Sequence, residues 1–279
     1  MTGRPPKAIT LYDEGTAGTL DSVEVTAWLR SWLPRVEVAR CGEFVGHWVG
    51  TMPDEERAPT LDRLARAFAA ARVRDPSQML EPREPLAGEV RFERARLAAD
   101  NCGPFGVAYD GWAFARVLGD LLPPDERSLT RPHIVFTNRL LATWDDDDLR
   151  YHLRVNVCTH PALISTSGLV EAPAKPRAFY EVQQSLGTAG SDPLAYERIK
   201  EEFRGRFIDH DDERLTEGIK GPVMQTVAYL ATGEAFCGDP ACRLFNAHWQ
   251  EELIAAQLGE GPEFCERHAA LLREWGHRA

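Results

Sequence analysis

The sequence contains no long hydrophobic run. No apolar stretch in its 279 residues approaches the roughly 18 residues that a membrane-spanning helix needs, so we expect a soluble protein. The opening residues, MTGRPPKAITLYDEG, lack the apolar core and small-residue cleavage site of a secretory signal peptide. These two absences together predict a cytoplasmic location.

Positive charge is also scarce. Lysine and arginine number 32 against 43 aspartate and glutamate residues, which gives a net charge of −11. A general nucleic-acid surface needs clustered cations to displace counterions. Nucleic acid is therefore not an expected partner, which leaves a small molecule or a peptide.

Cysteine is infrequent and unevenly placed. Without an export signal, the six cysteines are expected to be thiols or metal ligands rather than disulfides. Cys41, Cys102 and Cys158 are scattered, which is typical of buried structural cysteines. The other three lie close together near the C-terminus.

The chain divides by pattern into a sheet-bearing part, residues 1–175, and a helical part, residues 176–279. We expect both to form a single domain with an α/β or α+β fold, in which helices flank a mixed sheet. In the first part AITLYDEG, VEVAR, EFVGHWVG and much of residues 133–173 have strand-like sequences. A helix is predicted to begin at Asp21 and another to cover residues 60–73.

The strongest motif is Cys237-x4-Cys242, a 22-residue gap, and Cys265-x2-His268. The turn Gly238–Pro240 can bring two thiolates onto one ion, and Pro262 suits the first position of a helix that would place Cys265 and His268 on one face. Two close pairs of such ligands suit tetrahedral Zn²⁺, and four protein ligands leave no open position. The motif therefore predicts a structural zinc site.

Two alternatives to this ligand set remain open. The cysteines could be three buried thiols beside a surface histidine. His248, separated from Cys242 by five residues, is a rival fourth ligand. It could instead follow an N-cap at Asn246 and pair with Glu252 at i,i+4 spacing.

These C-terminal residues resemble the tail of the archaemetzincins, zinc metallopeptidases whose catalytic helix runs into a Cys-x4-Cys…Cys-x2-Cys structural zinc site. His268 stands where that pattern has its last cysteine. More of the chain, from LYDEGTAGTLD to FCERH, resembles an uncharacterised, largely prokaryotic family labelled as metallopeptidases. Its phrases here include VFTNRLLATW, HPALISTSGLVEAPAKPR and CRLFNAHWQEEL. The resemblance implies an archaemetzincin-like fold.

The catalytic motif of the metzincins is missing from the expected place. That motif, HExxHxxGxxH, supplies three histidine ligands and a glutamate base. Counting back from Cys237, the histidines would stand at Thr226, Leu230 and Phe236, and the glutamate at Val227. Only the motif's glycine, Gly233, is present, and it is expected to end an apolar helix.

Other candidate residues lie outside the motif. The segment from Ser165 to Arg177 is expected to be a loop that presents Glu171 and Lys175 to a ligand, or else a crossover with a salt bridge between them. Asp13 and Glu14 follow the first strand and would face the same crevice if the sheet is parallel there. His152, His160 and residues 209–212 are expected to be structural or solvated.

Two functions follow as hypotheses. The first is a hydrolase of metallopeptidase ancestry with a degenerate catalytic motif and a second metal elsewhere. The other is a pseudoenzyme, a zinc-stabilised binding module without catalysis. Two metals per chain would favour the enzyme, and one would favour the binding module. A third reading treats the segment from Ser165 to Arg177 as a small-molecule site.

Overall fold

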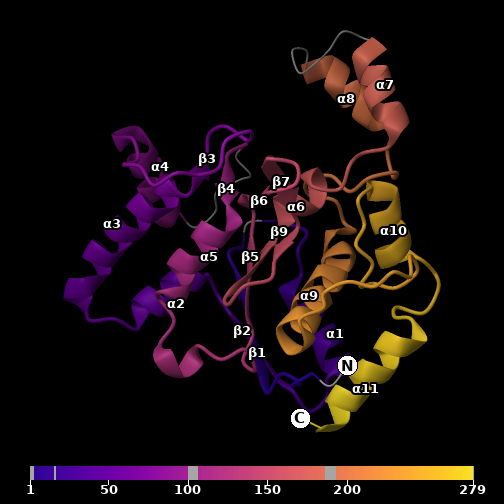
Figure 1. Ribbon diagram of the computed structural model, residues 1–279, viewed down its shortest axis with the longest axis horizontal. Coiled ribbons are helices and arrows are strands. Elements are labelled where there is room, and N and C mark those ends of the chain that lie inside the picture. The colour runs from indigo at the N-terminus through magenta and orange to yellow at the C-terminus, as the bar shows by residue number, and fades with distance from the viewer. Residues whose placement is uncertain (1–2, 16, 100–105, 186–192, 279) are drawn as a thin grey trace.

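The computed structural model describes residues 3–15, 17–99, 106–185 and 193–278. Cys102, expected to be a buried cysteine, lies outside these ranges. The described chain forms a mixed α/β fold with two sheets, where the sequence predicted one (Figure 1). No helix in the described ranges is both long and apolar enough to cross a membrane.

The larger sheet has the strand order β2-β1-β5-β9-β8. Its first four strands are parallel and β8 runs antiparallel to β9. The strands are β1 (Ala8–Asp13), β2 (Glu37–Cys41), β5 (His133–Thr137), β8 (Asn156–Val157) and β9 (Ala162–Ser165).

The smaller sheet has the order β3-β4-β6-β7, with only β4 and β6 parallel. Its strands are β3 (Arg72–Val73), β4 (Ala108–Asp110), β6 (Leu140–Asp145) and β7 (Arg150–Arg154). β7 and β8 are the outermost strands of their two sheets and follow each other in the chain, with a bend at Val155 between them.

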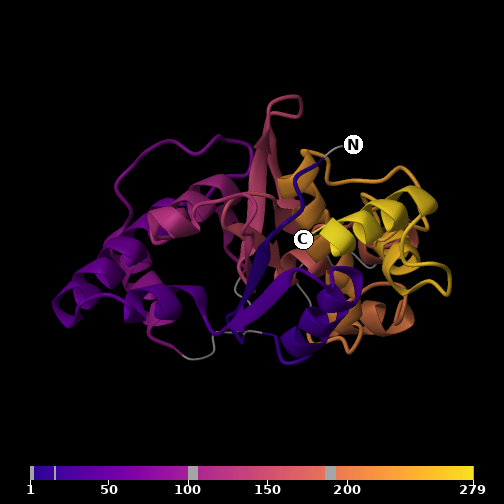
Figure 2. The same cartoon turned by 90° about the horizontal axis from the view of Figure 1, so that it is seen from below.

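Helices cover both faces of the larger sheet (Figures 1 and 2). In β5, Ile134 and Phe136 belong to one core while Val135 belongs to the other, as the alternation of side chains along a strand requires. On one side lie α2 (Phe44–Gly50), α3 (Asp54–Ala70), α4 (Ala87–Leu97) and α5 (Gly111–Gly119). The other side carries α1 (Ser22–Trp32), α9 (Leu215–Thr232), α10 (Gln250–Leu258) and α11 (Glu266–Arg278).

The remaining elements are short. They are a 3-10 turn at Pro124–Glu126, α6 (Thr166–Glu171), and the helix pair α7 (Arg177–Ser185) and α8 (Pro193–Glu202). The α7–α8 pair projects from one end of the molecule (Figure 1). It encloses a small core of its own made by Phe179, Ile199, Phe203 and Phe207.

Several local predictions are confirmed. AITLYD forms β1, and α1 begins after Asp21, whose side chain accepts hydrogen bonds from Val23 N and Glu24 N. Gly233 ends α9 with a φ of +80°, a conformation that glycine adopts without strain. The chain beyond Pro176 is largely helical.

Several local predictions are wrong. The helix predicted over residues 60–73 runs instead over Asp54–Ala70, and Arg72–Val73 form β3. EFVGHWVG is not a strand but α2, in which Glu43 caps the N-terminus and Phe44, Val45 and Val49 share the buried face. Residues 166–171 are helical, because the Ser165 side chain accepts a hydrogen bond from Gly168 N and so starts α6. The predicted loop therefore shrinks to the stretch between α6 and α7.

Candidate functional site

Cys237, Cys242, Cys265 and His268 come together in the C-terminal region. Their ligand atoms all lie within 4.8 Å of one another. The Sγ atoms of Cys237 and Cys265 are 3.8 Å apart, and His268 Nδ1 is 3.6 Å from Cys242 Sγ and 3.2 Å from Cys265 Sγ. Tetrahedral Zn²⁺ requires sulfur–sulfur separations of about 3.8 Å and sulfur–nitrogen separations of about 3.6 Å. The donor set therefore fits a zinc ion.

Local backbone hydrogen bonds form each half of this cluster. Cys242 N donates to Asp239 O and Cys237 N donates to Leu244 O, which closes a turn around the first pair. Asp239 N also points at Cys237 Sγ, 3.4 Å away, where it would stabilise a thiolate. In the second pair Ala269 N donates to Cys265 O, so Cys265 directly precedes α11 and His268 lies in its first turn.

The helix does not begin at Pro262, as the sequence suggested. It begins at Glu266, yet the i,i+3 spacing still brings Cys265 and His268 together. His268, and not His248, is the fourth member of the cluster. Burial raises the pKa of Cys242 to about 12 and lowers the pKa of His268. The neutral imidazole is the form that binds a metal, and a metal would be needed to hold the Cys242 thiolate.

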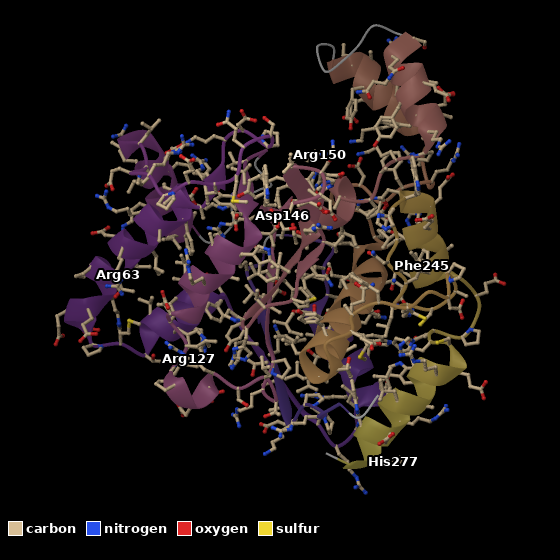
Figure 3. All side chains as sticks on the ribbon, in the orientation of Figure 1. Arg63, Arg127, Asp146, Arg150, Phe245 and His277 are labelled. Atoms are coloured by element: carbon tan, nitrogen blue, oxygen red, sulfur yellow. The ribbon has the colours of Figure 1, made fainter. Side chains whose placement is uncertain are left out.

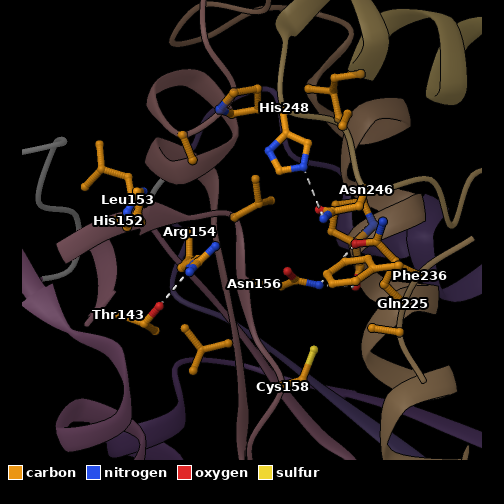
Figure 4. Close-up of a pocket in the computed structure, with 18 of the residues that line it drawn as sticks. Thr143, His152, Leu153, Arg154, Asn156, Cys158, Gln225, Phe236, Asn246 and His248 are labelled. Atoms are coloured by element: carbon orange, nitrogen blue, oxygen red, sulfur yellow. Dashed lines mark hydrogen bonds between the residues drawn. The ribbon is translucent and has the colours of Figure 1, made fainter. Parts of the chain in front are cut away.

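A groove of about 660 Å³ lies between β7 and β8 on one side and α9, α10 and parts of residues 235–248 on the other. Its strand wall includes Arg154, Asn156 and Cys158, and its opposite wall includes Gln225 and Phe236 (Figure 4). Figure 3 labels one residue of each wall, Arg150 and Phe245.

Side-chain amides tie the two walls together. Asn156 Nδ2 donates to Gln225 Oε1 at 3.2 Å, and Gln225 Nε2 donates to Phe245 O at 3.0 Å. Phe245 N in turn donates to Cys242 O. The strand edge, α9 and the segment that carries the first two cysteines are therefore connected by one chain of hydrogen bonds.

The edge beside the groove has backbone groups directed away from the sheet. Tyr151 N donates to Pro76 O rather than to β6, so Tyr151 faces outward in the ladder. Outward-facing positions alternate along an antiparallel edge, which places the N–H and C=O of Leu153 on the outer side as well. Leu153 lines the groove. An extended chain could pair with the edge at this position.

The positions of the metzincin motif do not fit a catalytic zinc. Thr226 and Val227 are fully buried in α9, and the Thr226 hydroxyl lies 3.8 Å from Cys158 Sγ. Phe236 is exposed and lines the groove. Within the described ranges, the Cys–His cluster is the only group of three or more His, Cys, Asp or Glu side chains that converges on a metal-sized space.

Glu171 and Lys175 lie at the end of α6 and just beyond it. Their charged atoms are 3.6 Å apart, and Glu171 lines the groove. The Lys175 side chain is buried instead, with its Nζ over the rings of Phe179 and Phe207. Lys175 thus joins the α7–α8 pair to the body of the protein.

Asp13 and Glu14 do stand at the carboxyl end of a parallel strand, but they bond away from the groove. Glu14 accepts a 2.7 Å hydrogen bond from the Thr137 hydroxyl and lies 3.3 Å from the Arg139 guanidinium. The Asp13 side chain accepts from Gly15 N. Glu14 and Glu171 therefore interact with different residues, and Glu14 does not line the groove as Glu171 does.

His248 and Glu252 interact through the backbone. Glu252 accepts from His248 N and Trp249 N at the start of α10, which begins after Trp249 and not after Asn246. The His248 ring lies 3.4 Å from the Asn246 amide and lines the groove (Figure 4). Glu252 is a capping residue, while His248 is available to a ligand.

Sequence reasoning missed the groove. Every residue from 150 to 158 lines the groove, and the polar ones among them include His152, Arg154, Asn156 and Cys158 at every second position. A run of polar residues with a period of two indicates one shared face of an extended chain. That pattern was the available signal, but the opposite wall comes from residues about 70 positions later and has no such pattern.

Comparison with known proteins identifies the chain's relatives. No curated protein matches it. A zinc-dependent peptidase from Methanocorpusculum labreanum (strain Z) is a similar solved structure, with 13% identity, a TM-score of 0.40, and coverage of 95% of this chain and 99% of that one. A likeness at that score carries no argument. Residues 5–275, however, match the family described as a probable metallopeptidase family, DUF6775. Because this match spans nearly the whole chain, the protein belongs to that family.

Proposed function

We propose that this protein is a zinc-stabilised peptide-binding member of its metallopeptidase family, with a degenerate catalytic motif. The observation that carries the proposal is Phe236. It stands where the third histidine of a metzincin site would be, and it presents an exposed aromatic ring to the groove. A side chain that cannot bind zinc thus lines a groove suited to an extended chain.

The groove supports binding in two ways. Its strand edge offers the outward backbone groups of Leu153, and peptides commonly add to such edges. Its volume of about 660 Å³ and its mixture of aromatic, amide and charged side chains are typical of a ligand site. Cleavage would need a metal-bound water or another activated nucleophile, and Thr226, Val227 and Leu230 supply neither.

Cys237, Cys242, Cys265 and His268 would hold the zinc ion. Four protein ligands leave no position for water, so the ion would stabilise the fold rather than activate a nucleophile. Elemental analysis of the purified protein should give about one zinc per chain. Two zinc ions per chain would contradict the proposal and favour a hydrolase with a relocated metal centre.

A second experiment tests binding directly. A mixture of blocked heptapeptides is incubated with the protein, and bound and cleaved peptides are measured separately by mass spectrometry. We expect retention of peptides without new fragments. The double variant Asn156→Ala and Phe236→Ala changes both walls and should abolish retention. Zinc-dependent fragments from the wild type would replace this proposal with the enzymatic one.

A further inference from the structure

Exposed aromatic side chains gather in the groove. Among the described residues, four large aromatic side chains are classed as exposed, and three of them line it: Trp112 at 53%, Tyr229 at 39% and Phe236 at 49%. Tyr180, on the projecting α7, is the fourth. Apolar rings concentrated in one concave region indicate contact with an apolar ligand group.

Arg154 adds a cation without a direct ion pair to the same groove. Its Nε donates to the Thr143 hydroxyl at 2.7 Å, and no carboxylate among the described residues lies within 4.0 Å of its guanidinium. Its charge does reach Asp145, whose pKa is lowered by backbone hydrogen bonds from Asp148 and Asp147 and, more weakly, by Arg154. The other arginine that lines the groove, Arg150, already lies 3.7 Å from Asp148. In a chain with a net charge of −11, a half-buried arginine without a direct ion pair is complementary to an acidic ligand.

The position of Arg154 shows which acidic group it would meet. In Figure 4 Arg154 lies part-way along the groove, with His248 toward one end and Cys158 toward the other. A ligand chain that fills the groove would therefore pass Arg154 and continue in both directions. That arrangement suits an acidic side chain within a peptide rather than a terminal carboxylate.

The geometry points to an extended peptide that carries an internal aspartate or glutamate against Arg154 and a large apolar side chain against Phe236, Tyr229 and Trp112. This inference rests on the proposed peptide binding and adds its specificity. The backbone of the peptide pairs with the β7 edge at Leu153, and its acidic side chain forms a charge-assisted hydrogen bond with the guanidinium of Arg154.

Positional heptapeptide pools test this specificity. Each pool is blocked at both termini, with one position fixed as Glu, Gln or Lys and another as Phe or Ala. Binding to the zinc-loaded protein is measured by fluorescence competition. We expect Glu pools to bind about tenfold more tightly than Gln pools at low salt, and Phe pools more tightly than Ala pools.

Substitutions of Arg154 distinguish loss of its charge from loss of the folded structure. Arg154→Gln should erase the preference for Glu over Gln while leaving the Phe preference, and Arg154→Lys should retain part of it. Arg204→Gln is the matched control, because it removes one exposed arginine that pairs with Glu201 far from the groove. Thermal melting of each variant shows whether it is folded.

The outcomes separate this inference from the proposed function. If no pool binds the wild type, both are overturned. If pools bind but Glu and Gln are equal, or if the preference survives Arg154→Gln in a folded variant, the acidic specificity is wrong while peptide binding stands. If only peptides with a free C-terminal carboxylate bind tightly, Arg154 holds a chain end and the internal acid is overturned.

Discussion

At the scale of single residues, the four ligands of the Cys–His cluster are the most direct targets. Cys237→Ser and Cys265→Ser each remove a thiolate from an otherwise complete tetrahedral set, so zinc content should fall from about one to well below one per chain. Cys41→Ser, at the end of β2, is the matched control and should leave the metal in place. Metal content unchanged by both ligand substitutions would rule out this site.

The environment of His133 predicts how the free energy of unfolding depends on pH. The ring is 2% exposed and its Nδ1 lies 2.9 Å from the Tyr12 hydroxyl. Burial, followed by the nearby His160, lowers the pKa of His133 from 6.5 to about 4, although Glu126 opposes the shift. The unfolded chain therefore takes up this proton at a higher pH than the folded protein.

It follows that the free energy of unfolding keeps the full His133 contribution above pH 6.5 and loses it as the pH falls toward 4. The loss should be at most about 3 kcal/mol. Urea titrations at several pH values measure it. His133→Asn should flatten the curve in that window, whereas His47→Asn, an exposed neighbour, should not. An equal slope in both variants would assign the effect to other groups.

At the scale of elements, the contact between α6 and β7 depends on Gly168. A Cβ at this position would lie 2.2 Å from the backbone oxygen of Arg154, and backbone cannot move aside as a flexible side chain can. Gly168→Ala should therefore destabilise the protein by about 2 kcal/mol or more, despite the better helix propensity of alanine.

Gly50 provides the comparison for this prediction. It also lies in a short helix, and a Cβ there would meet nothing within 4 Å. Gly50→Ala should be neutral or slightly stabilising in thermal and urea unfolding. Equal effects of the two substitutions would mean that α6 can shift away from the strand at little cost.

Secondary structure was predictable where local chemistry and burial agreed. Asp21 and Gly233 marked the two ends of helices that the structure contains. EFVGHWVG misled because its β-branched and aromatic residues favour a strand, while packing of Phe44 and Val49 on one face makes it a helix. The helix at residues 166–171 was predicted as a loop because a six-residue helix is too short to show a helical period.

At the scale of the whole molecule, the metal cluster and the groove share one segment. Residues 237–242 carry two ligands, while Phe236, Phe245 and His248 on either side line the groove. Glu263, just before Cys265, accepts hydrogen bonds from the indoles of Trp28 and Trp32 at 2.7 and 2.8 Å. Glu263 therefore connects the segment before α11 to α1, and the cluster joins that segment to residues 237–242.

If the cluster binds zinc as proposed, removal of the ion should affect both the fold of this segment and the groove. Chelation is expected to lower the melting temperature by about 10 °C, since a structural zinc contributes several kcal/mol, and to weaken peptide binding in parallel. Circular dichroism and the fluorescence assay follow the two effects, and added zinc should reverse them. Peptide affinity that persists in fully demetallated protein would show that the wall holds its position without the ion.

The sequence by itself predicted the three cysteines and a histidine of the cluster, because each pair is local: a turn joins Cys237 to Cys242, and one helical turn joins Cys265 to His268. It also determined that Thr226, Val227 and Leu230 offer neither a strong zinc ligand nor a base, since that is a matter of residue identity. Only the tertiary structure decided the choice of His268 over His248 and the place of the groove. Arg154 lies on one wall of the groove and Gln225 and Phe236 on the other, and the long-range strand pairing and helix packing that place these walls opposite each other leave no spacing pattern that joins them in the sequence.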